Sequence, residues 1–473
     1  MRKNSRPIRR LLAAALAGCL LAGCAGRELA LLPQSPPPQS APAPTETPAP
    51  QPLRIACEAP LPAGFEALLE AYAASQAAGA VLLDPGDAGG SPDLVLLARR
   101  PSVQGYLDLA QDPLFTVLIQ NAAALPGQDL SGPCPALPLG FGGYGYLADE
   151  ELLKALLGEG FDPALLQQAS SAEWTGFVQA LGGWIEQPAA QPVTLAGQEF
   201  TLPAEPPPAA QALTGVFAVP AAEPDVFAGS ALSPVLCTAF RTAGEAKADE
   251  ELLTGPLNSL WSAFRLETGW MAGPEGPLAR GDERAAGQTL ADAAGLVAGG
   301  RAVFCRAFTG RLLPLLPAEQ AARMLLAPLK YPFDETDLAP NAAYTLEQLA
   351  GWPVVGTAGW LAIPQDAGED ARARAEGFLL WLFASAEGQR ALTGGMGLLG
   401  IAGGEPGSPA LQTAADALAA GGALPDLAEG FAPAAHLQAS EALAKDWLPQ
   451  ASWNPYQRAG YTDAVLAALG GAE

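Results

Sequence analysis

The chain has 473 residues, of which 49% are hydrophobic and 16% are charged. Its 49 acidic and 25 basic residues give a formal net charge of -24 at pH 7, which argues against nucleic acid as a partner and against electrostatic docking on anionic lipid. About 420 residues follow a distinctive N-terminal region. That length exceeds one typical domain of about 150 residues and predicts two lobes.

The N-terminal region begins like a secretory signal. Five basic residues lie within the first ten positions, and the apolar run at 11–22 is shorter than the roughly 20 residues of a membrane-spanning helix. The LAGC motif at 21–24 resembles the cleavage site of a bacterial lipoprotein signal. The resemblance implies that residues 1–23 are removed, leaving a net charge of -29, and that the Cys24 thiol is acylated. The LAGC motif at 16–19 fits the same pattern but leaves a shorter apolar run, and an ordinary secretory signal is the alternative.

A proline-rich segment follows at 33–52 and reads PQSPPPQSAPAPTETPAPQP. Such a composition cannot bury a core and favours an extended polyproline II helix of roughly 3 Å per residue. We therefore interpret residues 24–52 as a linker that holds the folded part away from a membrane. The folded part is expected to begin near Leu53.

From Leu53 onward, short apolar runs alternate with alanine- and leucine-rich stretches of helical periodicity, which is the pattern of an α/β fold. One of these runs, at 94–97, has the wholly apolar character of a buried parallel strand. Residues 186–225 are so rich in Pro and Ala that they predict an irregular surface insertion with one hairpin at 193–202. The predicted elements before this insertion are strands at 53–57, 80–84 and 94–97 and helices at 63–75 and 105–109.

The residues available for chemistry exclude several classes of enzyme. His436 is the only histidine and lies in a helical stretch, where a surface or core role is commoner than catalysis, so zincins are excluded. No GxSxG, SxxK or GxxxxGK[ST] motif occurs, which leaves esterases, penicillin-binding proteins and P-loop enzymes without their nucleophile or phosphate loop. The paired carboxylates of a glycosidase need no fixed spacing and stay open. We expect no catalytic residue, no metal and no cofactor.

The folded part contains cysteines that are far apart in sequence and lack CxxC spacing, which argues against a zinc site. Buried free thiols are favoured over a single disulfide. These residues are Cys57, Cys134, Cys237 and Cys305.

Five sequence blocks, by their order and spacing, resemble one protein family. They are PDLVLL at 92–97, ALPLGFGGYGYLADEELLKALL at 136–157, AEWTGFVQALGGW at 172–184, AAGLVAGGRAVFCRAFTG at 293–310 and GWLAIPQDAGEDARARAEGFLLWLFASAEGQRAL at 359–392. With the lipoprotein-like signal, these blocks resemble the extracellular solute-binding proteins of ABC importers, of the large sugar-binding type called family 1. The chain departs from the family at 146–149, where Tyr-Leu-Ala-Asp replaces a common Tyr-Asn-Lys-Asp.

The resemblance implies an α/β fold of two lobes, similar to that of periplasmic binding proteins, with a ligand cleft between the lobes and a hinge that closes on the ligand. Crossing segments are expected near 138–141 and 357–363. The implied division is lobe 1 at 53–139 plus 357–405 and lobe 2 at 140–356 plus 406–473.

A sugar needs aromatic side chains for its C–H faces and hydrogen-bonding groups for its hydroxyls. The resemblance directs attention to such residues near the crossings and at the carboxyl ends of strands, where ligands bind in open α/β sheets. A tryptophan is more often part of a core or of lobe packing than a ligand platform, and Arg99 could equally be a charge in a solvated loop. The candidate ligand-binding residues are Glu58, Arg99, Phe141, Tyr144, Trp270, Arg306, Phe308 and Trp360.

The expected function is that of a lipid-anchored protein on the outer face of the cell membrane, which captures an oligosaccharide and delivers it to an ABC permease. It is expected to be a monomer, to bind no nucleic acid and to catalyse no reaction. The alternative is the same scaffold serving as a sensor or scavenging lipoprotein for a non-sugar solute or a protein partner. An anchored glycosidase is the least favoured function because the sequence singles out no pair of carboxylates.

Overall fold

The computed structural model describes residues 51–58, 61–76, 78–83, 91–122, 132–223, 231–279, 282–445 and 455–470. The signal, Cys24 and almost all of the linker lie outside these ranges. Among the described helices, none combines the length and the apolar character needed to span a membrane.

The first sheet is built from β1 (Leu53–Cys57), β2 (Ala80–Leu83), β3 (Leu94–Leu97), β4 (Leu137–Pro138) and β12 (Trp360–Ala362), in the order β2-β1-β3-β12-β4. Strand β1 is parallel to both β2 and β3, whereas β12 is antiparallel to β3 and β4. Every residue of β3 is buried, as its apolar sequence predicts. The predicted strands at the start of the fold are therefore confirmed.

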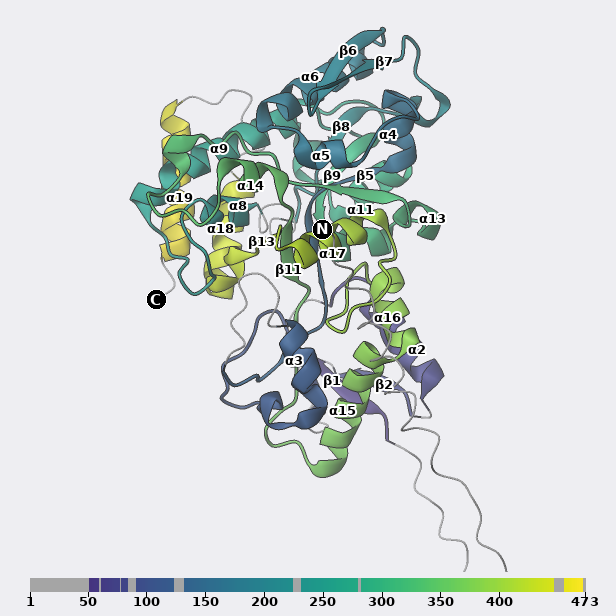
Figure 1. Cartoon of the computed structure of the whole chain (residues 1–473), viewed down its shortest axis with the longest axis vertical. Helices are drawn as coiled ribbons and strands as arrows, with labels where there is room; N and C mark the ends of the chain where they lie inside the picture. Colours follow the sequence, from purple (N-terminus) through teal and green to yellow (C-terminus); the bar gives the residue numbers. More distant parts are fainter. Residues whose placement is uncertain are drawn as a thin grey trace, which may run out of the picture. The chain divides into compact units, whose positions relative to one another are not determined.

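Helices α2 (Phe65–Ser75), α3 (Thr116–Ala122) and α15 (Glu369–Ala384) pack against this sheet (Figure 1). Helix α2 begins after Gly64, which has a φ of +78°, and it buries the apolar residues that recur at helical spacing in its sequence. One of them, Tyr72, lies edge-on to Phe378 of α15 with ring centroids 5.0 Å apart. The predicted helix at 63–75 is confirmed.

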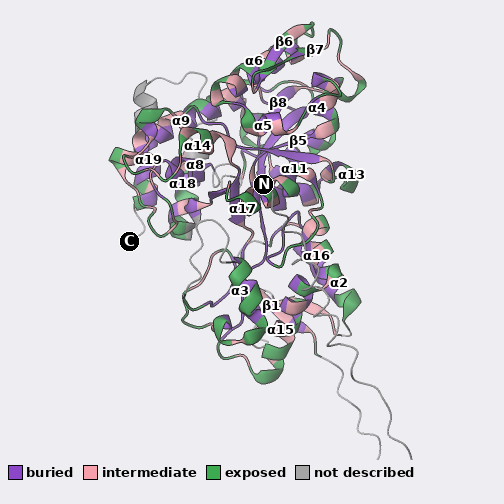
Figure 2. Ribbon diagram, viewed as in Figure 1, coloured by how far each residue is buried: buried purple, intermediate pink, exposed green. Residues whose placement is uncertain are grey.

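The second sheet has the order β13-β11-β5-β9-β8, and β10 pairs with the far half of β5. Its strands are β5 (Phe141–Asp149), β8 (Gly215–Ala218), β9 (Ala302–Phe308), β10 (Met324–Ala327), β11 (Val354–Thr357) and β13 (Leu424–Pro425). Strand β5 is antiparallel to β9, β10 and β11, whereas β8 is parallel to β9. Figure 2 shows β5 and β8 as buried strands, while the outward faces of the surrounding helices are exposed.

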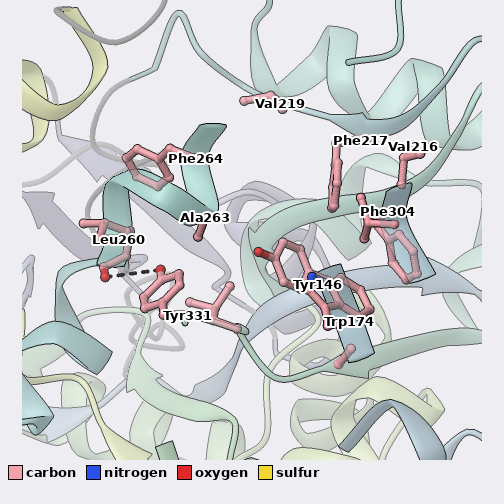
Figure 3. Close-up of a cluster of buried hydrophobic side chains, with 14 of the residues drawn as sticks. Tyr146, Trp174, Val216, Phe217, Val219, Leu260, Ala263, Phe264, Phe304 and Tyr331 are labelled. Carbon is pink, nitrogen blue, oxygen red and sulfur yellow. Dashed lines mark hydrogen bonds between the residues drawn. The ribbon is translucent and has the colours of Figure 1, made fainter. Parts of the chain in front are cut away.

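Helices α6 (Ser171–Glu186) and α9 (Glu250–Gly269) contact β8, while α17 (Pro409–Ala420) contacts β5 and β10. An aromatic cluster fills the core between α6 and the sheet (Figure 3). Tyr146 stacks on Trp174 with centroids 5.0 Å apart, and the edge of Phe304 meets Trp174 at the same distance. Such pairs add about 0.5–1.5 kcal/mol each beyond their buried area.

The remaining helices connect these strands or cover their edges, and α18 lies beside α19. They are α4 (Glu150–Leu157), α5 (Ala164–Gln168), α8 (Leu232–Cys237), α10 (Glu283–Ala286), α11 (Leu290–Ala298), α12 (Thr309–Leu312), α13 (Ala318–Ala321), α14 (Leu346–Gly351), α16 (Ala386–Arg390), α18 (Pro433–Lys445) and α19 (Pro455–Gly470).

The Pro- and Ala-rich segment is only partly an irregular insertion. The predicted hairpin is confirmed as β6 (Gln191–Leu195) and β7 (Gln198–Leu202), which lie beside α6 (Figure 1). Its turn places Ala196 and Gly197 at φ values of 51° and 74°, as a two-residue hairpin turn requires. The irregular character predicted further along is wrong at β8, because this buried strand of the second sheet has too few residues to produce a visible periodicity.

The helix predicted at 105–109 is also wrong. Gly105 has a φ of +89°, a left-handed conformation that interrupts a helix, and Tyr106 forms an isolated bridge with Pro364. The Asp108 side chain then accepts a hydrogen bond from the Ala110 N–H and caps a short 3-10 turn, Leu109–Gln111. The apolar spacing of so short a segment cannot distinguish a helix from this bridge and turn.

Among the described strands, the chain passes between the two sheets three times. It does so once from β12 to β13, by way of α15, α16 and α17, and in two short passages, from β4 to β5 and from β11 to β12, within the ranges where crossings are expected. The two passages are hydrogen-bonded to each other: the Leu139 N–H donates to the Gly359 carbonyl at 2.9 Å, and the Ala358 N–H donates to the Gly140 carbonyl at 3.0 Å. Phe141 and Leu399 exchange a further pair of backbone bonds. The division into lobes 1 and 2 stays a prediction.

Candidate ligand-binding site

The candidate site begins at the crossing strands, where Gly142 of β5 pairs with Gly356 of β11. A Cβ atom at Gly142 would overlap the Thr309 hydroxyl and the Phe308 ring, so only glycine fits there. At Gly356, a Cβ atom would lie 3.0 Å from both the Asp426 carboxylate and the Tyr144 ring. The missing side chains therefore let an aromatic ring and a carboxylate approach the strand backbone.

Tyr144 and Phe308 form an aromatic pair at this point. Their ring centroids are 4.5 Å apart with an interplanar angle of 29°, and the two residues are paired across β5 and β9. Phe308 is 4% exposed, whereas Tyr144 is half-buried. Phe308 thus supports the ring of Tyr144, and Tyr144 is the member of the pair that a ligand can reach.

Asp426 follows β13 and brings a carboxylate to the same place. Its Oδ1 accepts a hydrogen bond from the Ser233 hydroxyl of α8 and another from the Ala428 N–H at 3.2 Å. Burial raises the pKa of Asp426, while the Ser233 hydrogen bond and the charges of His436 and Arg99 act in the opposite direction. Arg99 follows β3 of the first sheet, so groups from both sheets act on this carboxyl group.

The carboxyl edge of the first sheet supplies further polar groups. Glu58 directly follows β1 and is exposed, and its N–H donates to the Leu96 carbonyl at 3.0 Å. Burial raises the pKa of Tyr106, and the nearby charge of Glu58 adds to this shift. Because β1 and β3 are parallel, Glu58 and Arg99 lie at the same sheet edge, as predicted.

Arg306 lies in the core of the second sheet and is 2% exposed. Its guanidinium lies 3.5 Å from the Glu267 carboxylate and 4.3 Å from the ring centroid of Phe264. The Tyr146 hydroxyl donates to Glu267 at 2.7 Å. Burial raises the pKa of Glu267, and Arg306 and Tyr146 partly offset this. A role for Arg306 in ligand binding stays a prediction, while its visible role is to balance a buried carboxylate.

The other predicted aromatic residues lie apart from the Tyr144 ring. Trp360 is 1% exposed in a small cluster with Val95 and Leu97, and its indole N–H has no acceptor among the described residues. Trp270 packs its ring on Gly182 and lines a separate cavity of about 360 Å³ at the end of β8 remote from the crossings. Phe141 is a buried residue of the crossing itself. As ligand contacts, all three remain predictions.

Sequence reasoning missed several residues of this site. Asp426 follows a two-residue strand, and Ser233 lies in an alanine-rich stretch without a motif, so neither gives a sequence signal.

No group of three or more His, Cys, Asp or Glu side chains in the described part of the chain could hold a metal ion. All four cysteines of the folded part are free thiols, and burial raises the pKa of Cys305 to about 12, which keeps it protonated and unreactive.

No protein-family profile matches the chain. No curated protein matches it in sequence. Solved structures do match it in fold. The solute-binding protein RafE in complex with raffinose has a TM-score of 0.57 at 9% identity and covers 89% of this chain and 99% of its own. The putative binding protein MsmE from Bacillus subtilis, in an open conformation, has a TM-score of 0.55 at 11% identity and covers 90% of this chain and 98% of its own.

A solute-binding protein from Streptococcus pneumoniae, in complex with the blood group A-trisaccharide, has a TM-score of 0.51 at 11% identity and covers 89% of this chain and 99% of its own. Sequence identities this low establish architecture alone. Over nearly its whole folded part, the chain has the two-lobe α/β fold of solute-binding proteins.

Proposed function

We propose that this protein is an extracellular solute-binding protein that captures a neutral carbohydrate at the crossing strands. The observation that carries the proposal is the half-buried Tyr144 ring, stacked on Phe308 and placed beside the Asp426 carboxylate over a pair of glycines. The fold supports it, because structural neighbours are described in complex with raffinose and with a blood group trisaccharide.

The chemistry of the site favours a neutral sugar. The ring of Tyr144 offers a face for the C–H groups of a pyranose, and carboxylates are strong acceptors for its hydroxyls. Glu58 and Asp426 bring acidic groups to the site and Arg99 brings a basic one, so the site holds groups of both charge types. A charged ligand would leave one of these groups unbalanced.

The proposed setting is the outer face of the cell membrane. A diacylglyceryl group on Cys24 and the linker at 24–52 would tether a monomeric binding domain next to an ABC permease, to which closure of the two lobes would deliver the sugar. The absence of known nucleophile and phosphate-loop motifs supports binding without catalysis. A sensor or scavenger on the same scaffold would bind its ligand without a permease.

A thermal-shift screen tests the proposal. A neutral mono- or oligosaccharide at 100 times its dissociation constant should add about 2.7 kcal/mol to the free energy of unfolding. The same sugar should give a smaller shift with Tyr144→Ala, and the wild-type shift with Gln120→Ala, a change on the exposed face of α3. A panel of galactose, raffinose, stachyose and chitotriose that stabilises neither wild type nor control would contradict carbohydrate capture.

A further inference from the structure

A cavity of about 820 Å³ lies between α5 and α14, next to the second sheet. It shares no lining residue with the candidate site at the crossing strands, which we call the crossing site. We call this cavity the α5–α14 pocket. The lining residues that matter for its chemistry are Gln167, Gln168, Ser171, Phe333, Glu347 and Trp352. Its volume falls within the range of about 300–1,000 Å³ that ligand sites occupy.

A buried lysine holds the walls of this pocket together. Lys330 is 2% exposed, and its ammonium donates to the carbonyls of Gln167 at 3.0 Å, Ala169 at 2.7 Å and Ala350 at 2.6 Å. These carbonyls lie at the carboxyl ends of α5 and α14, where a positive charge is favourable. The two walls are therefore fixed to each other, and the cavity is a defined feature of the fold.

The lining offers polar groups that the described part of the chain leaves without partners. The side-chain amides of Gln167 and Gln168 and the Glu347 carboxylate have no hydrogen bond or ion pair with the described part of the chain. An amide can donate to one hydroxyl and accept from another, which suits the adjacent hydroxyls of a sugar. The Ser171 hydroxyl is already engaged, since it donates to the Tyr331 carbonyl at 2.7 Å.

Aromatic rings and a single charge complete the lining. Phe333 and Trp352 are half-buried, so each ring keeps part of its surface accessible. Glu347 is the one charged side chain among the lining residues, and it would repel an anion. Accessible rings beside these amides, with no basic side chain among the lining residues, match the needs of an uncharged polyhydroxylated ring.

We propose that the α5–α14 pocket is a second binding site for a neutral carbohydrate, contacted by Phe333 and Trp352 through its C–H face and by Gln167 and Gln168 through its hydroxyls. The lining of this pocket includes neither Tyr144 nor Asp426, so binding here can be tested separately from binding at the crossing site. Two independent sites would let one chain hold an oligosaccharide both where it is captured and at the surface of the second sheet.

The test is a titration followed by fluorine NMR on protein labelled with 5-fluorotryptophan, in which the Trp352 signal is assigned by its loss in Trp352→Phe. The probes are galactose, raffinose, stachyose and chitotriose. At least one of them should shift the Trp352 signal in a saturable way, and it should do so equally in the Tyr144→Ala variant. No shift with any probe in folded protein, or a shift that disappears in Tyr144→Ala, would overturn the second site.

Side-chain variants sharpen the test. Replacing both amides, Gln167→Leu with Gln168→Leu, should weaken the binding reported by Trp352 at least about tenfold, the equivalent of about 1.4 kcal/mol. The matched change Gln120→Leu, on the exposed face of α3, should leave it unaltered. Equal weakening in both variants, or tighter binding of glucuronate than of the neutral probes, would contradict the assignment of these amides to an uncharged sugar.

Discussion

At the scale of single residues, the extent of burial separates charged groups that maintain the fold from charged groups that a ligand can reach. Arg306 and Glu267 are both almost fully buried and lie 3.5 Å apart. Removing one member of a buried pair leaves the other charge uncompensated, which costs about 3–5 kcal/mol. By contrast, Arg99 is half-buried just beyond the carboxyl end of β3, and its charge acts on the Asp426 carboxylate of the candidate site.

We predict that Arg306→Met lowers the free energy of unfolding by about 3–5 kcal/mol. The double variant Arg306→Met with Glu267→Gln should recover much of this loss, because no charge is then left in the core. Denaturant unfolding measures both, with Arg390→Met at an exposed position as the control. A stable single variant that binds sugar poorly would instead make Arg306 a ligand contact.

Lys330 gives a prediction for pH. Burial lowers the pKa of Lys330 to about 7, opposed by the charge of Glu173, whereas an unfolded lysine has a pKa of about 10.4. Between these values the unfolded state binds more protons than the folded state, so the free energy of unfolding contributed by this group rises with pH. Wild type should therefore gain stability relative to Lys330→Met as the pH increases from about 7 to about 10. A parallel pH dependence of the two proteins would show that Lys330 does not titrate there.

At the scale of elements, the sequence predicts structure where a local pattern and its tertiary setting agree. The apolar run of β3 and the helical spacing in α2 are each decided by burial on the sheet, and both are confirmed. The segment at 105–109 begins with a positive φ at Gly105 and forms a bridge from Tyr106 to the distant residue Pro364, neither of which its apolar spacing encodes. The same holds for the candidate site. Tyr144 lies in a glycine-rich block that the sequence itself marks, whereas Asp426 reaches the site only through the pairing of β13 with β11.

The crossing strand gives a prediction at this scale. Gly142→Ala should destabilise the protein and weaken sugar binding, because the added methyl group overlaps Thr309 and the Phe308 ring that supports Tyr144. Gly176→Ala is the matched control, since it lies on the exposed face of α6 with open space around it. That change should be neutral or stabilise by up to about 1 kcal/mol. Thermal unfolding and sugar titration of both variants check this, and a Gly142→Ala protein with wild-type affinity would contradict the close approach.

At the scale of the whole molecule, the acidic folded part, the proline-rich linker and the signal-like N-terminus are compatible with a tethered binding protein. We predict that Cys24→Ala abolishes lipid attachment and releases the protein from membranes in a bacterial host. Metabolic labelling with a radioactive fatty acid measures this, with Cys19→Ala as the control that should keep its label. Labelling that persists in Cys24→Ala and is lost in Cys19→Ala would move the anchor to the earlier cysteine.

Capture of a neutral sugar by the Tyr144 ring is tested most directly by titration calorimetry at low and high salt, with wild type, Tyr144→Ala and Trp360→Ala. The sugar is the one that gives the largest thermal shift. Affinity should barely change with salt, because stacking and hydrogen bonds to a neutral ligand are not screened. Tyr144→Ala should lose about 1–3 kcal/mol of binding free energy, by analogy with base stacking on aromatic side chains, whereas Trp360→Ala should mainly lower stability because Trp360 is buried. Wild-type affinity in Tyr144→Ala, or a steep loss of affinity with salt, would contradict the proposed site.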